Sequence, residues 1–86
     1  MKGVNWIDFH PTENIVATCS DDKLIKLWNF TSSNAFEDQV FHGHTHNVSC
    51  VAFSPDGKYL YSNGEDFTLR MWDLKGNLKA KFEISD

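Results

Sequence analysis

Three histidines alternate with other residues in the segment FHGHTHN, at positions 42, 44 and 46. Imidazole nitrogens are common zinc ligands, and side chains two residues apart along a strand point to the same face. Gly43 indicates a turn, however, and a turn would separate the three rings. We therefore expect no metal site here, with His42 and His46 as solvated flanks.

Ser62, His44 and Asp66 are the residue types of a hydrolase triad, in which a base activates a hydroxyl nucleophile. The sequence around Ser62 has no GxSxG motif, and no oxyanion donors are evident. The sequence therefore predicts no catalytic residue and no cofactor, and it favours a structural role for this set.

An internal repeat determines how these residues are positioned. Trp28 lies 44 residues before Trp72, and the same step relates the other matching residues without a gap from position 4 to position 30. A period of this length is typical of a repeat architecture. The further pairs are Val4 and Val48, Phe9 and Phe53, Pro11 and Pro55, Asp22 and Asp66.

Each unit has the short alternating apolar runs and turn residues of β-strands. The units are expected at residues 1–41 and 42–86, with four strands each and an all-β fold. The first set of expected strands is 4–9, 15–19, 24–29 and 38–41, and the second is 48–54, 59–63, 68–73 and 78–84. The segment Pro55, Asp56, Gly57 indicates a tight turn between two of them.

Three short motifs follow one another in the second unit: GH at 43–44, PDG at 55–57 and WD at 72–73. Their order and spacing resemble the WD-repeat family of β-propellers, and WN at 28–29 is a variant of the last motif. The resemblance implies two four-stranded antiparallel blades, an incomplete portion of a propeller. Because the first unit would have its own GH histidine at position 0, we expect the chain to be part of a longer protein.

The same resemblance implies a buried polar relay in each blade, formed by Trp72, Ser62, His44 and Asp66 in the second unit. These types satisfy one another, because an indole only donates, a carboxylate only accepts, and a hydroxyl and an imidazole do both. In the first unit the matching residues are Thr18, Asp22 and Trp28.

A narrower resemblance is to the N-terminal propeller of coatomer alpha subunits, carried by GVNWIDFHPT, DDKLIKLW, AFEDQVFHGHTHNVSCVAF and SNGEDFTLRMWD. It implies a non-enzymatic vesicle-coat subunit of Golgi-to-ER and intra-Golgi transport that recognises dilysine cargo signals. It also implies other coatomer subunits as partners, a cytoplasmic location, and attachment to Golgi membranes and COPI vesicles through the coat only. The alternative is a general cytosolic WD-repeat scaffold of another complex.

Polar residues near the expected turns at one rim are the candidates for peptide binding: Asn5, Asp21, Asn47, Ser49 and Glu65. Two of them are acidic at equivalent positions, which would suit a basic peptide. The net charge of −4 and the absence of a Lys/Arg cluster disfavour nucleic acid as a partner. Cys19 and Cys50 lie in apolar runs without metal-site spacing, so we expect small core residues.

Overall fold

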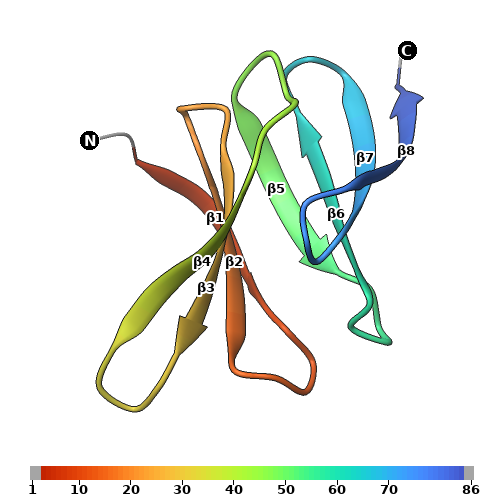
Figure 1. Cartoon of the computed structure of the whole chain (residues 1–86). Coiled ribbons are helices and arrows are strands. Elements are labelled where there is room, and N and C mark those ends of the chain that lie inside the picture. Colours follow the sequence, from red (N-terminus) through yellow and green to blue (C-terminus); the bar gives the residue numbers. More distant parts are fainter. Residues whose placement is uncertain (1–2, 85–86) are drawn as a thin grey trace.

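The computed structural model describes residues 3–84 and forms two four-stranded antiparallel sheets (Figure 1). The expected all-β fold is confirmed. The first sheet has the order β1 (Val4–Phe9), β2 (Ile15–Ser20), β3 (Ile25–Phe30), β4 (Ala35–Phe41). The second has β5 (Val48–Phe53), β6 (Tyr59–Gly64), β7 (Thr68–Asp73), β8 (Leu78–Glu83). A helix able to cross a membrane is absent from the described residues.

The strands follow the alternation of the sequence, and the turns follow the glycines. Along β7, Thr68, Arg70 and Trp72 are buried while the residues between them are half-buried. Gly57 has a φ of 75° in the turn between β5 and β6, where its N–H donates to the carbonyl of Ser54 at 2.9 Å. A positive φ of this size favours glycine because a side chain would be strained.

The structure corrects the expected start of β4, which lies at Ala35 and not at residue 38. Ala35 pairs with Phe30, so the loop between β3 and β4 is a tight one. The N–H of Thr31 donates to the carbonyl of Asn34 at 2.8 Å and closes this loop. The strand β3 runs over Ile25–Phe30, one residue later than expected, and β2, β5, β6 and β8 each end within one residue of the expected end.

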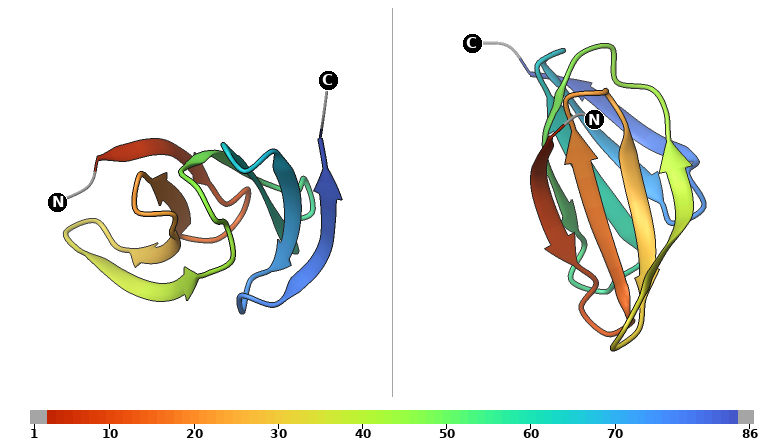
Figure 2. Two further views of the ribbon diagram at one scale, coloured as in Figure 1. Left: turned by 90° about the horizontal axis from the view of Figure 1, so that it is seen from above. Right: turned by 90° about the vertical axis from the view of Figure 1, so that its left-hand side faces the viewer.

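The apolar core lies between the two sheets, which stand side by side in the view from above (Figure 2). Strands β1 and β2 lie next to β5, and of these two strands only β2 contributes residues to the core. Cys19 is buried in it, Cys50 is half-buried, and both are free thiols. The core consists of Ala17, Cys19, Ile25, Leu27, Phe41, Val48, Val51, Phe53, Leu60 and Trp72.

Three polar side chains from β1 and the residue after it tie the first sheet to the second. Asn5 Nδ2 donates to the carbonyl of Val48 at 2.9 Å, and Asp8 Oδ2 accepts from the N–H of Phe53 at 2.8 Å. His10 Nε2 lies 2.8 Å from the carbonyl oxygen of Gly57. The positions 44 residues later are Ser49, Ala52 and Ser54, so the second unit does not repeat these three side chains.

His10 aligns with Ser54 and lies next to a turn, but its ring also contacts the second unit. Its Nδ1 accepts from the N–H groups of Thr12 and Glu13, at 3.1 and 3.0 Å. The ring proton therefore lies on Nε2, which donates to the carbonyl of Gly57. The ring also meets Phe53 edge to face, with 5.1 Å between centroids.

We predict that Gly57→Ala destabilises the fold through this contact. A Cβ at position 57 would lie 2.5 Å from the His10 ring, and the positive φ would add strain of about 1 to 2 kcal/mol. Chemical denaturation of both single variants and of the His10→Ala/Gly57→Ala double variant measures the coupling. The double variant should lose less stability than the two single variants lose together, because removal of the His10 ring removes the clash with the new Cβ. Strict additivity would contradict the contact.

Candidate functional site

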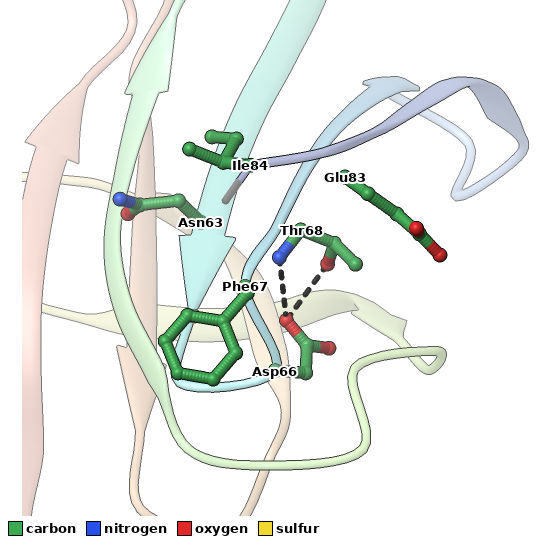
Figure 3. Close-up of a pocket in the computed structure, with 7 residues that line it drawn as sticks. Asn63, Asp66, Phe67, Thr68, Glu83 and Ile84 are labelled. Atoms are coloured by element: carbon green, nitrogen blue, oxygen red, sulfur yellow. Dashed lines mark hydrogen bonds between the residues drawn. The ribbon is translucent and has the colours of Figure 1, made fainter. Parts of the chain in front are cut away.

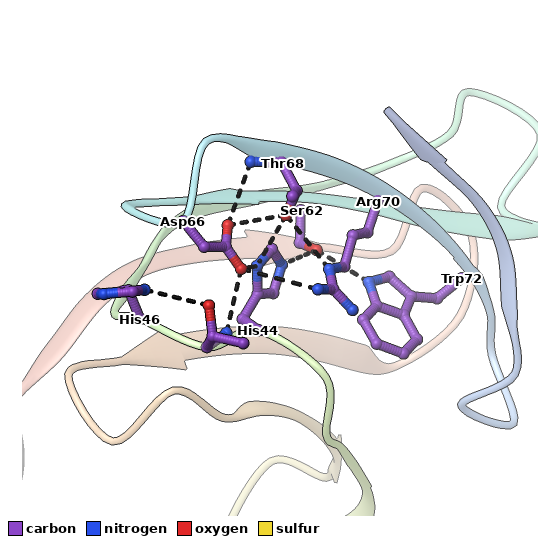
Figure 4. Close-up of polar contacts among 8 residues, drawn as sticks. His44, His46, Ser62, Asp66, Thr68, Arg70 and Trp72 are labelled. Atoms are coloured by element: carbon purple, nitrogen blue, oxygen red, sulfur yellow. Dashed lines mark hydrogen bonds and ion pairs between the residues drawn. The ribbon is translucent and has the colours of Figure 1, made fainter. Parts of the chain in front are cut away.

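A chain of four polar side chains crosses the second sheet (Figure 4). The indole Nε1–H of Trp72 on β7 donates to Ser62 Oγ on β6 at 2.8 Å. Ser62 Oγ lies 2.7 Å from His44 Nε2, and His44 Nδ1 lies 2.9 Å from Asp66 Oδ2. His44 lies in the link from β4 to β5, and Asp66 lies in the turn from β6 to β7. We call these four side chains the relay.

The carboxylate determines the direction of the relay. Asp66 only accepts when ionised, so His44 carries its proton on Nδ1 and Ser62 donates its hydroxyl proton to Nε2. Burial lowers the pKa of His44, the hydrogen bond to Asp66 opposes this, and the net shift is downward. Burial raises the pKa of Asp66, but hydrogen bonds from Thr68, His44 and Thr45 outweigh burial and hold it far below 3.8. The pair is therefore a neutral imidazole and a carboxylate.

Thr68 and Arg70 also interact with Asp66, and neither was among the predicted site residues. Thr68 Oγ1 donates to Asp66 Oδ1 at 2.7 Å. Arg70 Nη2 lies 3.8 Å from Asp66 Oδ2, and Arg70 Nε donates to Thr68 Oγ1 at 3.2 Å. The period of two along β7 was the available signal, since it places both on the face of Trp72.

Gly43 lets the link between the sheets pass close over this cluster. A Cβ at position 43 would lie 2.9 Å from Trp72 Cη2 and 2.6 Å from Arg70 Nη1. The indole ring is rigid and 2% exposed, so it has little room to yield. A glycine directly before His44 is therefore required by space.

The geometry suits a structural clamp better than catalysis. Ser62 is 1% exposed, and its hydroxyl is occupied by both Trp72 and His44. His42 and His46 are exposed while His44 is buried, so the three rings do not share one environment. Within residues 3–84 no three His, Cys, Asp or Glu side chains are placed to hold a metal ion.

The first sheet has a shorter version of the cluster. Trp28 Nε1–H donates to Thr18 Oγ1 at 3.0 Å, as Trp72 does to Ser62. Asp22 instead accepts from the hydroxyl of Ser20 and from the N–H of Leu24. The hydrogen bond from Ser20 lowers the pKa of Asp22. Asp22 Oδ1 thus caps its own turn, as Asp66 Oδ1 does by accepting from the N–H of Thr68.

The candidate peptide-binding residues fall into two pairs and a single residue. Asn5 Nδ2 donates to the exposed Asp21 Oδ1 at 2.8 Å, so these two bind each other. The backbone N–H of Glu65 donates to the carbonyl of Asn47 at 2.9 Å, and the Glu65 side chain is exposed. Ser49 is exposed on β5. The structure therefore places Asp21 in an existing contact and leaves Glu65 and Ser49 open to solvent.

A family model described as "WD domain, G-beta repeat" matches residues 1–29 and 37–73, which is most of the chain. The chain belongs to the WD40 repeat family. The WD40 chain is 34% identical over 83 residues to transcription initiation factor TFIID subunit 5 of Caenorhabditis elegans, covering 96% of the chain and 12% of that protein. It is 44% identical over 73 residues to DDB1- and CUL4-associated factor 13 of Dictyostelium discoideum, covering 84% of the chain and 16% of that protein.

A third WD40 relative is the target of rapamycin complex subunit wat1 of Schizosaccharomyces pombe, 32% identical over 72 residues. That match covers 84% of the chain and 23% of wat1. The chain thus spans less than a quarter of each of these three relatives. None of the three is named as a coat subunit, so they support the WD-repeat resemblance and leave the coatomer resemblance without support.

We predict that acid destabilises this WD40 chain through His44. Burial holds the pKa of His44 in the fold below its ordinary value of 6.5, so the unfolded chain binds more protons below that pH. The free energy of unfolding should fall as pH drops below about 6.5, by at most about 1.4 kcal/mol per pH unit from this residue. Urea denaturation at a series of pH values from 7.5 to 5 measures this pH dependence of the free energy of unfolding. His44→Gln should flatten the slope, whereas the exposed His46→Gln should keep it; equal slopes in all three proteins would contradict the assignment.

Proposed function

We propose that the chain is a non-enzymatic scaffold that holds proteins together in a larger assembly. The observation that carries this proposal is its WD40 membership together with relatives named as subunits of different assemblies, a transcription initiation factor and a target of rapamycin complex. A shared module across such different complexes fits a general binding role. This supports the alternative of a general WD-repeat scaffold above a vesicle-coat subunit.

The structure supports a scaffold because the side chains of the relay hydrogen-bond to one another. The hydroxyl of Ser62 and both nitrogens of His44 already have partners, and the cluster is buried. The loops carried by this clamp are short and held by backbone hydrogen bonds. Loops on a rigid support are where binding residues are typically found.

The surface that we propose for binding is the end where three connections lie together: the β2–β3 turn, the link from β4 to β5, and the β6–β7 turn (Figure 1). It includes Asp21, Asn47 and Glu65, with Asn5 and Ser49 on the strands beside them. Two exposed carboxylates among these five residues favour a partner with basic side chains.

The narrower proposal, recognition of dilysine cargo tails within a COPI-type coat at the Golgi, has less support. It rests on the sequence resemblance and on the acidic pair Asp21 and Glu65, and Asp21 already accepts a hydrogen bond from Asn5. Coat subunits as partners and a cytoplasmic, Golgi-associated location stay predictions of that resemblance. A dilysine peptide that binds the protein, and fails to bind the Asp21→Lys/Glu65→Lys variant, would favour it.

The scaffold proposal is tested by reversing one charge at each end of the second sheet. Glu65→Lys changes the proposed surface, and Lys58→Glu changes the exposed turn between β5 and β6 at the other end. Size-exclusion chromatography of cell extracts follows whether the protein elutes with a large assembly. We expect Glu65→Lys to move most of it to low mass and Lys58→Glu to leave it in place. Both variants eluting as wild type, with unchanged melting temperatures, would contradict the proposed surface.

A further inference from the structure

The outer strands β4 and β8 each leave one edge unpaired. They stand at the ends of their sheets, so among residues 3–84 β4 pairs with β3 alone and β8 pairs with β7 alone. The unpaired edge of a strand presents backbone N–H and C=O groups, which a further strand can bind. Both outer edges are therefore places where another chain can add a strand.

The openness of these edges does not depend on what flanks the two sheets. The edge of β4 stays unpaired with the second sheet packed beside it, and the edge of β8 stays unpaired with the first sheet packed beside it. Seen from above, both strands lie on the outside of the pair of sheets (Figure 2). Packing of one sheet on another covers faces, so it leaves these two edges free.

The free face of the second sheet is different in this respect. A pocket of ≈ 660 Å³ opens on it beside Asn63, near the turn where Asp66 accepts from Thr68 (Figure 3). Asn63 lies 44 residues after Cys19, which is buried between the sheets. By the repeat, this face corresponds to a packed face of the first sheet. The pocket therefore belongs to a packing face, whereas the outer edges do not.

Each outer strand also exposes an apolar side chain that the neighbouring sheet does not cover. Phe36 is 58% exposed and lies opposite Asn29, on the face that carries Leu27 in the core. Leu78 is 44% exposed and lies opposite Trp72, which is also in the core. Because the other sheet is already present on these faces, the exposure of both side chains belongs to the outer edge.

The charges of the two outer strands are opposite. The strand β4 reads AFEDQVF and has two acidic residues and no basic one, whereas β8 reads LKAKFE and has two lysines before its final Glu83. Glu37 and Lys79 each form an ion pair within their own sheet. Asp38 and Lys81 are exposed and form no ion pair among residues 3–84. Each edge thus has a charge available to a second strand.

These charges determine which edges can pair. Two copies of β4 side by side would place acidic residues opposite acidic residues, and two copies of β8 would place lysines opposite lysines. Like charges on neighbouring strands destabilise a pair, whereas opposite charges stabilise it. The strand β8 alternates apolar and basic residues from Leu78 to Phe82, so its chemistry matches that of β4.

We propose that β4 of one copy pairs edge to edge with β8 of a second copy. Backbone hydrogen bonds continue the sheet across the contact, and the acidic residues of β4 lie beside the lysines of β8. A bulge in each strand, at Asp38 and at Lys79, keeps the ladder short, so the association is weak and reversible. The two edges are different surfaces, so the contact is heterologous and each copy can bind a neighbour at either edge. This self-association goes beyond the scaffold function and does not use the surface around Glu65.

Sedimentation velocity of the purified protein over a roughly hundredfold range of concentration tests the contact. We expect the mean sedimentation coefficient to rise with concentration, and to rise less at high salt because salt screens exposed charges. Hydrogen exchange measured by mass spectrometry locates the contact. Peptides from β4 and β8 should exchange more slowly at high protein concentration, and the peptide with the β5–β6 turn should not change.

Two charge reversals separate the edges. Asp38→Lys changes only β4 and Lys81→Glu changes only β8, and each alone should weaken self-association about fivefold or more. An equimolar mixture of the two variants should associate again, because the intact β8 of the first binds the intact β4 of the second. Both melting temperatures should stay at the wild-type value, since neither residue has an ion pair to lose among residues 3–84.

Glu13→Lys and Lys58→Glu are the matched controls, because they reverse exposed charges in the β1–β2 and β5–β6 turns. Both should associate as the wild type does. Three results would overturn the proposal: a sedimentation coefficient that does not change with concentration, equal self-association by all variants, which would place the contact on the sheet faces, or a mixture as dissociated as its components. The assembly test with Glu65→Lys does not depend on these outcomes, so the two proposals can fail separately.

Discussion

Replacing Asp66 with alanine should lower the free energy of unfolding by about 3 to 5 kcal/mol. The carboxylate accepts from His44 Nδ1 at 2.9 Å, from the N–H of Thr45 at 3.1 Å and from Thr68 Oγ1 at 2.7 Å. Its removal leaves these donors without an acceptor and leaves buried Arg70 without its opposite charge. Urea denaturation followed by tryptophan fluorescence measures the change.

Asp56→Ala is the matched control for that experiment. Asp56 also caps a turn, accepting from Ser54 Oγ at 2.6 Å and from the N–H of Lys58 at 3.0 Å, but its side chain is exposed. Solvent can replace both bonds, so this variant should lose far less stability than Asp66→Ala. Equal losses would mean that Asp66 acts only as a turn residue and that the relay adds nothing.

Trp72→Ala should cost a similar amount, about 3 to 5 kcal/mol, mainly through the cavity that it leaves. The side chain is 2% exposed, and its ring lies 5.3 Å from that of Phe41 between centroids. Trp72→Phe keeps a six-membered aromatic ring, removes the N–H that Ser62 accepts, and leaves a smaller cavity than alanine does. We expect about 1 to 3 kcal/mol for the phenylalanine variant.

Trp28→Ala provides the comparison within the same protein. Trp28 makes the equivalent hydrogen bond to Thr18, but it is half-buried, so its removal leaves a smaller cavity. Thermal unfolding of the three tryptophan variants should therefore rank Trp72→Ala as the least stable. If Trp28→Ala were as damaging, burial between the sheets would not explain the importance of Trp72.

Much of the strand arrangement could be predicted from the sequence because alternation and turn residues are local signals. The strand β7 has the predicted bounds, and Gly57 takes the expected turn conformation. The start of β4 was missed because its first residues, Ala35 and Phe36, follow the polar stretch TSSN, which reads equally well as part of a loop. Only the pairing of Ala35 with Phe30 determines that start.

The polar contacts between units were harder to predict than those within one. The set containing His44 and Trp72 follows a family motif, so its members could be named from their spacing. His10 could not be linked to Gly57 in this way, because the contact joins different units and the second unit has Ser54 in place of the histidine. For the same reason nothing in the sequence indicated that Asn5 would bind the carbonyl of Val48.

The spacing of these contacts along the chain has a consequence for the order of folding. The bonds of the relay join residues 10, 18 and 22 positions apart, whereas the ties of Asn5, Asp8 and His10 join residues 43, 45 and 47 apart. Closing a longer loop costs more entropy and slows contact formation. We therefore expect the second sheet to form its polar clamp as a local nucleus, and the first sheet to dock against it later and more slowly.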